Sequence, residues 1–128
     1  MEMMHNAISW FEIPVTDFER AKKFYSAIFD FEMPTMPLGE GMMGFLLHDM
    51  QAGGVGGAIV YYPDIYIPSR LGPKVYLSGG RDLTVVLDRV EGAGGKVTRA
   101  KFLVAPGRGH VAGFMDTEGN EIYLHSPE

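Results

Sequence analysis

The pattern of apolar and polar residues divides the chain into two similar halves. Residues 7–15 are typical of a strand, and residues 16–29 follow with apolar side chains at helical intervals. Residues 73–80 again predict a strand, and residues 81–97 again predict a helix with glycines at its carboxyl end. The order of strand and then amphipathic helix therefore occurs twice.

Each predicted helix carries one apolar face. At the start of the first helix, Thr16 and Glu19 have the spacing of a capping box. The apolar stripe of the first helix comprises Phe18, Ala21, Phe24, Tyr25 and Ile28, and that of the second comprises Leu83, Val86, Leu87 and Val90. Both helices are therefore expected to pack one face on a sheet.

Three strand-like stretches follow each helix. They cover residues 31–36, 44–49 and 55–61 in the first half, and 96–104, 110–116 and 120–126 in the second. The chain is therefore predicted to be βαβββ twice, with module 1 at about residues 6–62, module 2 at about 73–126 and a join near 69–73. Neither module can bury its helix stripe and sheet face alone, so residues 1–128 are expected to form a single domain.

The last predicted strand has two different faces. Glu121, Tyr123 and His125 point to one side of the strand, and Ile122 and Leu124 point to the other. One face is therefore expected to pack on a core, while the other is polar and is a candidate site.

Charge and composition exclude several classes of function. The net charge is −5 and the 11 Lys and Arg residues are scattered, so nucleic acid is not an expected partner. No apolar run approaches the roughly 20 residues that span a bilayer, and the first residues lack a signal-peptide pattern, so we expect a cytoplasmic protein with no membrane partner. The chain has no cysteine, which excludes disulfides, thiolate metal sites and cysteine nucleophiles.

The features of the two modules together resemble one superfamily. An aspartate opens each predicted helix, Asp17 and Asp82, and the segments KKFYSAIFDF (22–31) and DTEGNEIYL (116–124) complete the pattern. The chain is similar in these respects to the glyoxalase, bleomycin-resistance and dioxygenase superfamily, also called vicinal oxygen chelate. The resemblance covers nearly the whole chain. It implies an α+β fold in which two βαβββ modules form a curled mixed sheet around a cavity.

The resemblance also implies where metal ligands would lie. Counted from the helix-opening aspartates and the turn glycine Gly119, the family's ligand positions are Trp10, Val75 and Tyr123, with a fourth near Gly57. An indole is only a donor and an aliphatic chain has no lone pair, so Trp10 and Val75 cannot replace His and Glu. The neutral hydroxyl of Tyr123 is a poor ligand unless other residues already hold the metal. We therefore expect no metal and no other cofactor.

A substitute metal site is a second possibility to test. Glu12, two residues beyond Trp10, could converge with Glu121, His125 and His110 in the cavity. A histidine on a strand is more often hydrogen-bonded to its neighbours, so the interpretation without a metal is favoured.

The expected inner face is apolar with a few polar groups, as in small-molecule sites. The predicted ligand-binding residues are Trp10, Glu12, Val75, Leu77, Glu121, Tyr123 and His125. Trp10 and Tyr123 either contact a ligand or fill the space of the missing ion. Glu12 either pairs with a residue such as Tyr123 or His125, or it contacts the ligand or transfers a proton. Its carboxylate is also the expected acceptor for the Trp10 indole and the Tyr123 hydroxyl.

Two segments, 33–43 and 61–73, are predicted to be loops that are unusually rich in Met, Tyr, Ile and Pro. Either they form a lid over the pocket or they form a dimer contact. The dimer is favoured, because single-domain members of the superfamily usually pair.

Three kinds of function are open at this point. The first is metal-independent binding of a small, partly aromatic molecule. The alternative is a lyase or isomerase, related to lactoylglutathione lyase, in which Glu12 or His125 serves as acid or base. The third is a protein-interaction role with a vestigial cavity. Whether the protein is an enzyme is left open by the sequence.

Overall fold

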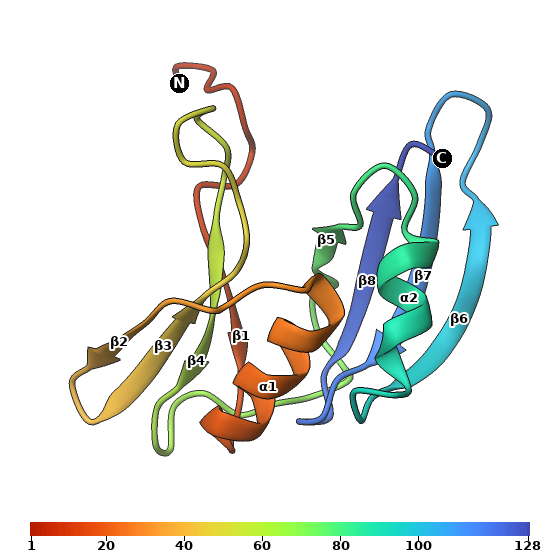
Figure 1. The fold of residues 1–128 in the computed structure, drawn as a ribbon. Helices are drawn as coiled ribbons and strands as arrows, with labels where there is room; N and C mark the ends of the chain where they lie inside the picture. Colours follow the sequence, from red (N-terminus) through yellow and green to blue (C-terminus); the bar gives the residue numbers. More distant parts are fainter.

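The computed structural model describes residues 1–128 and contains two helices and eight strands (Figure 1). Module 1 consists of β1 (Phe11–Pro14), α1 (Phe18–Phe29), β2 (Thr35–Leu38), β3 (Gly41–Phe45) and β4 (Gly57–Tyr61). Module 2 consists of β5 (Tyr76–Ser78), α2 (Thr84–Val90), β6 (Lys96–Leu103), β7 (His110–Met115) and β8 (Glu121–Ser126). The predicted βαβββ order of both modules is confirmed. Neither helix is long and apolar enough to cross a membrane.

The strands form two sheets with the same topology. The strand order is β1-β4-β3-β2 in module 1 and β5-β8-β7-β6 in module 2. The first strand of each module runs parallel to the last, and the other neighbours are antiparallel. The α+β fold is confirmed. The expected curled sheet is divided in two, because β1 and β5 are edge strands that do not hydrogen-bond to each other.

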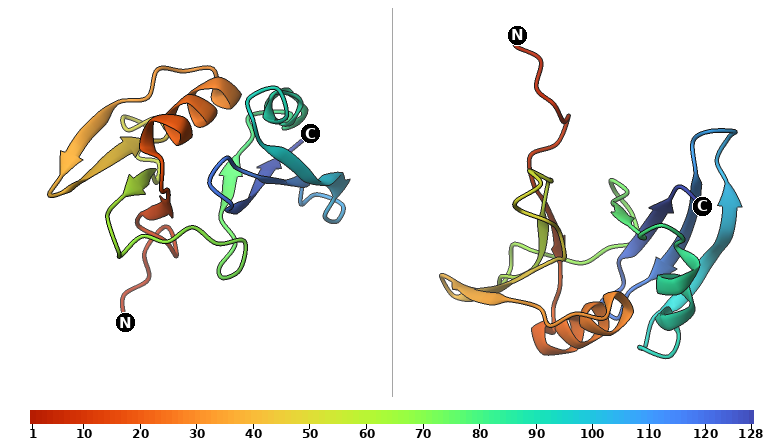
Figure 2. Two further views of the ribbon diagram at one scale, coloured as in Figure 1. Left: turned by 90° about the horizontal axis from the view of Figure 1, so that it is seen from below. Right: turned by 45° about the horizontal axis from the view of Figure 1, so that its top comes forward.

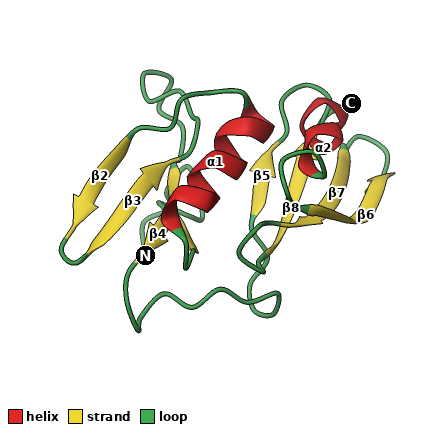
Figure 3. Ribbon diagram, turned by 60° about the horizontal axis from the view of Figure 1, so that its bottom comes forward, coloured by secondary structure: helices red, strands yellow, loops and turns green.

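Both helices lie on the same side of the sheets (Figure 3). Ile13 of β1, Phe24 of α1, and Phe114 and Leu124 of module 2 belong to a single core cluster between helices and sheets. The connection between β4 and β5 runs along the opposite side, as the left view of Figure 2 shows. We call the side of the sheets away from the helices the open face.

Helix α1 begins at Asp17, the aspartate expected to open it, and not at a capping box. The N-cap is Asp17, whose carboxylate accepts a hydrogen bond from the Arg20 N–H at 3.1 Å. The expected capping box of Thr16 and Glu19 is wrong, because the Thr16 hydroxyl donates to Glu118 of module 2 instead, at 3.2 Å.

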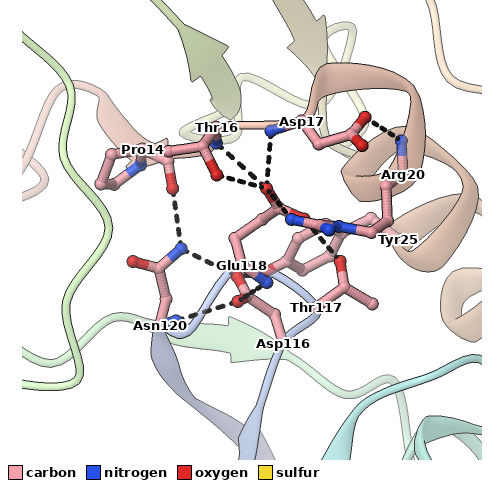
Figure 4. A network of polar contacts seen from close by, with 9 residues as sticks. All are labelled: Pro14, Thr16, Asp17, Arg20, Tyr25, Asp116, Thr117, Glu118 and Asn120. Atoms are coloured by element: carbon pink, nitrogen blue, oxygen red, sulfur yellow. Dashed lines mark hydrogen bonds and ion pairs between the residues drawn. The ribbon is translucent and has the colours of Figure 1, made fainter. Parts of the chain in front are cut away.

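Glu118 lies at the centre of a polar network between the two modules (Figure 4). Its side chain has no exposed area. One carboxylate oxygen accepts hydrogen bonds from the backbone N–H groups of Thr16 at 3.0 Å and Asp17 at 2.8 Å. The other oxygen accepts a hydrogen bond from Arg20 Nε at 2.7 Å. The β7–β8 turn of module 2 is therefore joined directly to the start of α1.

Asp116 and Asn120, on the same turn, extend this network. The Tyr25 hydroxyl donates to Asp116 at 2.7 Å inside the core. The Asn120 amide donates to the Pro14 carbonyl at 2.7 Å and to Asp116 at 2.9 Å, and its oxygen accepts the Ser69 N–H at 3.1 Å. The DTEGN segment is therefore the main polar connection between the modules.

The two predicted loops have different structures. Segment 33–43 is mostly the β2–β3 hairpin, so the expectation of a loop there is wrong. The pairing of Thr35 with Gly44 through Leu38 with Gly41 satisfies its backbone groups. Segment 61–73 is the crossing connection between the modules.

Candidate ligand-binding site

On the open face of module 1, three residues form one row across the sheet. Strand register pairs Glu12 of β1 with Ala58 of β4, and Ala58 with Phe45 of β3, and paired residues point to the same side. Ala58 is fully buried, while Glu12 and Phe45 are half-buried. The methyl group of Ala58 therefore separates a carboxylate from an aromatic ring.

Glu12 accepts hydrogen bonds from two aromatic residues. The Trp10 indole Nε1 donates to one oxygen at 3.2 Å, and the Tyr66 hydroxyl donates to the other. The predicted bond from Trp10 is confirmed, whereas the predicted bond from Tyr123 is wrong. The phenol that donates to Glu12 is instead Tyr66, from the connection between the modules. Its hydrogen bond to the carboxylate raises the pKa of the Tyr66 hydroxyl above its usual value.

Further aromatic rings surround this pair. Trp10 packs edge to face on Phe45, with ring centroids 6.1 Å apart, and retains 38% of its surface exposed. The ring centroids of Tyr66 and Tyr62 lie 6.5 Å apart. Trp10, Glu12, Phe45, Tyr62 and Tyr66 therefore form a continuous group on the open face, which we call the aromatic site.

The open face of module 2 carries a second aromatic pair. Tyr76 of β5 is in register with Tyr123 of β8, and their ring centroids lie 5.0 Å apart. A side chain at Gly113 would come within 3.1 Å of the Tyr123 ring, so this glycine leaves room for the ring against the sheet. Tyr123 therefore lies on the predicted face, and its aromatic neighbour is Tyr76.

Val75 and Leu77 do not share the open face with Tyr123. Leu77 is in register with Leu124 and is 6% exposed in the core, and Val75 packs against the same core from its edge. The expected common face is wrong for these two residues, because alternation places Tyr76 and Ser78 on the open side of β5.

The polar residues of β8 have local partners. Glu121 accepts from Lys74 at 3.0 Å, with Arg70 at 3.9 Å, and its side chain is 11% exposed. The hydrogen bond from Lys74 lowers the pKa of Glu121. His125 is exposed, with Nε2 2.9 Å from the Arg108 carbonyl oxygen. Glu121 and His125 therefore lie on the predicted strand face, but each is bonded to residues of module 2 and not to Glu12.

A cleft with a volume of about 1260 Å³ separates the edge strands β1 and β5. Glu12 lines it from module 1, and Lys74, Tyr76 and Ser78 line it from module 2. Val75, Leu77, Phe29, Val86 and Arg89 are also among its lining residues. The aromatic site therefore adjoins the cleft through Glu12.

Comparison with known proteins agrees with this architecture. The bleomycin resistance protein-like N-terminal family matches residues 8–45. A glyoxylase-like domain-containing protein from Didymella fabae is 33% identical over 129 residues, with 92% of this chain and 91% of that protein covered. The chain belongs to the vicinal oxygen chelate superfamily.

Solved structures of the superfamily share the fold. TnmS3 from Streptomyces sp. CB03234, described as an antibiotic binding protein, has a TM-score of 0.66 and 24% identity, with 99% of this chain and all of that chain covered. Glyoxalase I from Zea mays has a TM-score of 0.69 and 18% identity, and this chain spans 92% of its own length but 43% of the maize chain. At these identities the similarity shows the fold alone.

The residues present do not fit the superfamily's divalent ion. Trp10 and Tyr123 occupy two of its positions, and the Trp10 indole already donates to Glu12. Gly57 has no side chain that could bind a metal ion, and the Phe11 ring occupies the adjacent space, 2.2 Å from where a Cβ would lie. No group of three or more His, Asp or Glu side chains in the structure is arranged so that it could hold a metal ion, and this applies to the substitute set of Glu12, Glu121, His125 and His110.

Three of the five residues of the aromatic site, Phe45, Tyr62 and Tyr66, were missed by the sequence interpretation, and so was Tyr76 on the open face of module 2. Tyr76 could have been found, because Val75 and Leu77 alternate with Tyr76 and Ser78. Tyr66 gives no such signal, since it lies in an irregular connection 54 positions from Glu12.

Proposed function

We propose that this protein binds a small, partly aromatic molecule at the aromatic site, without a resident metal. One observation carries the proposal: a partly exposed indole ring is fixed by a carboxylate on the open face of the sheet. A ring fixed before binding loses little conformational freedom when a ligand stacks on it. The site is therefore suited to flat aromatic ligands.

The surroundings support the same proposal. The Phe45 ring packs against the indole, and the Trp10 N–H and the Tyr66 hydroxyl both donate to Glu12, so the polar atoms of the site are already bonded. The adjoining cleft of about 1260 Å³ leaves space for the rest of a ligand. The resemblance in fold to an antibiotic binding protein is consistent with this class of ligand.

The proposed partner protein is a second copy of the chain. Ile65, Ile67 and Leu71, on the connection between the modules, are each more than two-thirds exposed. A homodimer would cover these apolar side chains.

A thermal-shift screen tests the proposal. The panel contains small neutral and charged aromatic molecules, with divalent metal ions as a separate arm. A ligand at one hundred times its Kd raises the free energy of unfolding by about 2.7 kcal/mol, which is readily measured. We expect stabilisation by aromatic compounds and none by metal ions. Stabilisation by a metal ion alone would contradict the proposal.

A further inference from the structure

Glu12 is a carboxylate without a cationic partner. The five ion pairs of the structure involve Glu118, Glu121, Glu128 and Asp82, with Glu121 in two of them, and none involves Glu12. Its hydrogen-bond donors are a neutral indole and a neutral phenol. These bonds orient the carboxylate but leave its negative charge unbalanced.

The basic residues of the cleft do not supply the missing charge. Three of them, Lys74, Arg81 and Arg89, line the cleft that Glu12 also lines. Their partners are, in order, Glu121 at 3.0 Å, Glu128 at 2.7 Å and the Ile28 carbonyl at 3.1 Å. Each of these three basic side chains is thus already bonded to a group other than Glu12.

Aromatic rings flank the unbalanced carboxylate. Trp10 and Tyr66 both contact it, and Phe45 follows across the sheet in the same row. The faces of such rings attract organic cations, and tryptophan does so most strongly. A carboxylate and several π-faces together favour a cation that is weakly hydrated. The net charge of −5 attracts such a ligand at longer range.

We infer that the ligand of the aromatic site is a small aromatic cation, such as an N-alkylated heterocycle, with its charge beside Glu12 and its ring on Trp10. This inference rests on the binding function proposed above. A neutral aromatic molecule would gain the stacking but would leave Glu12 without a counter-charge. An aromatic anion would be repelled by Glu12.

A matched pair of probes tests the inference at pH 8. N-methylquinolinium carries a permanent positive charge, and quinoline has nearly the same shape but is neutral at that pH. Affinities are measured by isothermal titration calorimetry. Emission from Trp10, the single tryptophan of the chain, reports whether binding occurs at the site. We expect the wild-type protein to bind the cation at least about tenfold more tightly.

Two variants complete the experiment. Glu12→Gln keeps the shape of the side chain and removes its charge, so the preference for the cation should fall to within about twofold. Glu32→Gln removes one charge at an exposed position without side-chain bonds, and it should keep the preference. Thermal melts of both variants verify that they are folded.

The possible results distinguish a failure of the cation inference from a failure of the proposed binding function. Equal binding of both probes by the wild-type protein overturns the cation inference and leaves the proposed function standing. An equal loss of preference in Glu12→Gln and Glu32→Gln also overturns it, because overall charge then explains the effect. Binding of neither probe overturns the inference as well, and the wider aromatic panel then decides the proposed function.

Discussion

Glu118 and Arg20 join the two modules of this protein across 98 positions of sequence. The Arg20 guanidinium donates to both Glu118 oxygens, Nε at 2.7 Å and a terminal nitrogen at 3.1 Å. The glutamate is buried and the arginine is half exposed, so the ion pair closes the network from the solvent side. This pair is therefore one of the contacts that hold the two modules together, beside the Asn120 and Asp116 hydrogen bonds and the shared core.

Replacing Glu118 by Gln should therefore destabilise the fold. The amide keeps the shape but loses the charge that binds Arg20 and two backbone N–H groups. We expect a loss of about 1 to 3 kcal/mol in the free energy of unfolding, measured by urea denaturation. The control Glu32→Gln should change it by less than about 0.5 kcal/mol. Equal effects of both variants would show that the network does not stabilise the protein.

The same carboxylate predicts a specific dependence on pH. Burial alone would raise the pKa of Glu118, but the hydrogen bonds from Arg20, Asp17 and their neighbours outweigh it and lower the pKa from 4.5 to about 2. A lowered folded-state pKa gives stability that is present above pH 4.5 and is lost as the pH falls toward 2. The difference in stability between wild type and Glu118→Gln should shrink over this range. A difference that is constant from pH 6 to pH 2.5 would contradict the assignment.

The elements of the fold were predictable because their signals are local. The helical stripe from Phe18 to Ile28 and the alternation in residues 121–126 each occur within one segment. The face of β5 was predicted wrongly, although its own alternation of apolar Val75 and Leu77 with Tyr76 and Ser78 contained the answer.

The site was less predictable because it depends on contacts between distant segments. Trp10 and Glu12 are two positions apart on an extended strand start, so their hydrogen bond could be inferred. Tyr66 reaches Glu12 from an irregular connection whose path is set by its attachments, such as the Ser69 N–H on Asn120. No spacing or periodicity in the sequence encodes that path.

The protein is expected to be a dimer in solution. Light scattering at micromolar concentration should give twice the chain mass of 14.1 kDa. Ile67→Lys places a charge on the exposed apolar connection, so it should shift the mass toward the monomer. A wild-type monomer would mean that the connection is a lid and not a contact between copies.

We expect no glyoxalase I activity from the purified protein. Isomerisation of the glutathione hemithioacetal in the superfamily depends on a metal that polarises its oxygens, and Trp10, Tyr123 and Gly57 supply no ligand set for that ion. Assays with and without added nickel or zinc verify this. Turnover that appears on addition of either metal would contradict the interpretation of the site.

Binding of a small aromatic molecule at Trp10 can be measured directly. The most direct measurement is the calorimetric affinity of the best aromatic compound from the screen for wild type, Trp10→Ala and Leu103→Ala. Trp10 is 38% exposed and Leu103 is 52% exposed, so both variants should fold. The account predicts an affinity at least about tenfold weaker for Trp10→Ala, because the stacking surface is removed, and an unchanged affinity for Leu103→Ala. An affinity of Trp10→Ala equal to that of wild type would contradict the account.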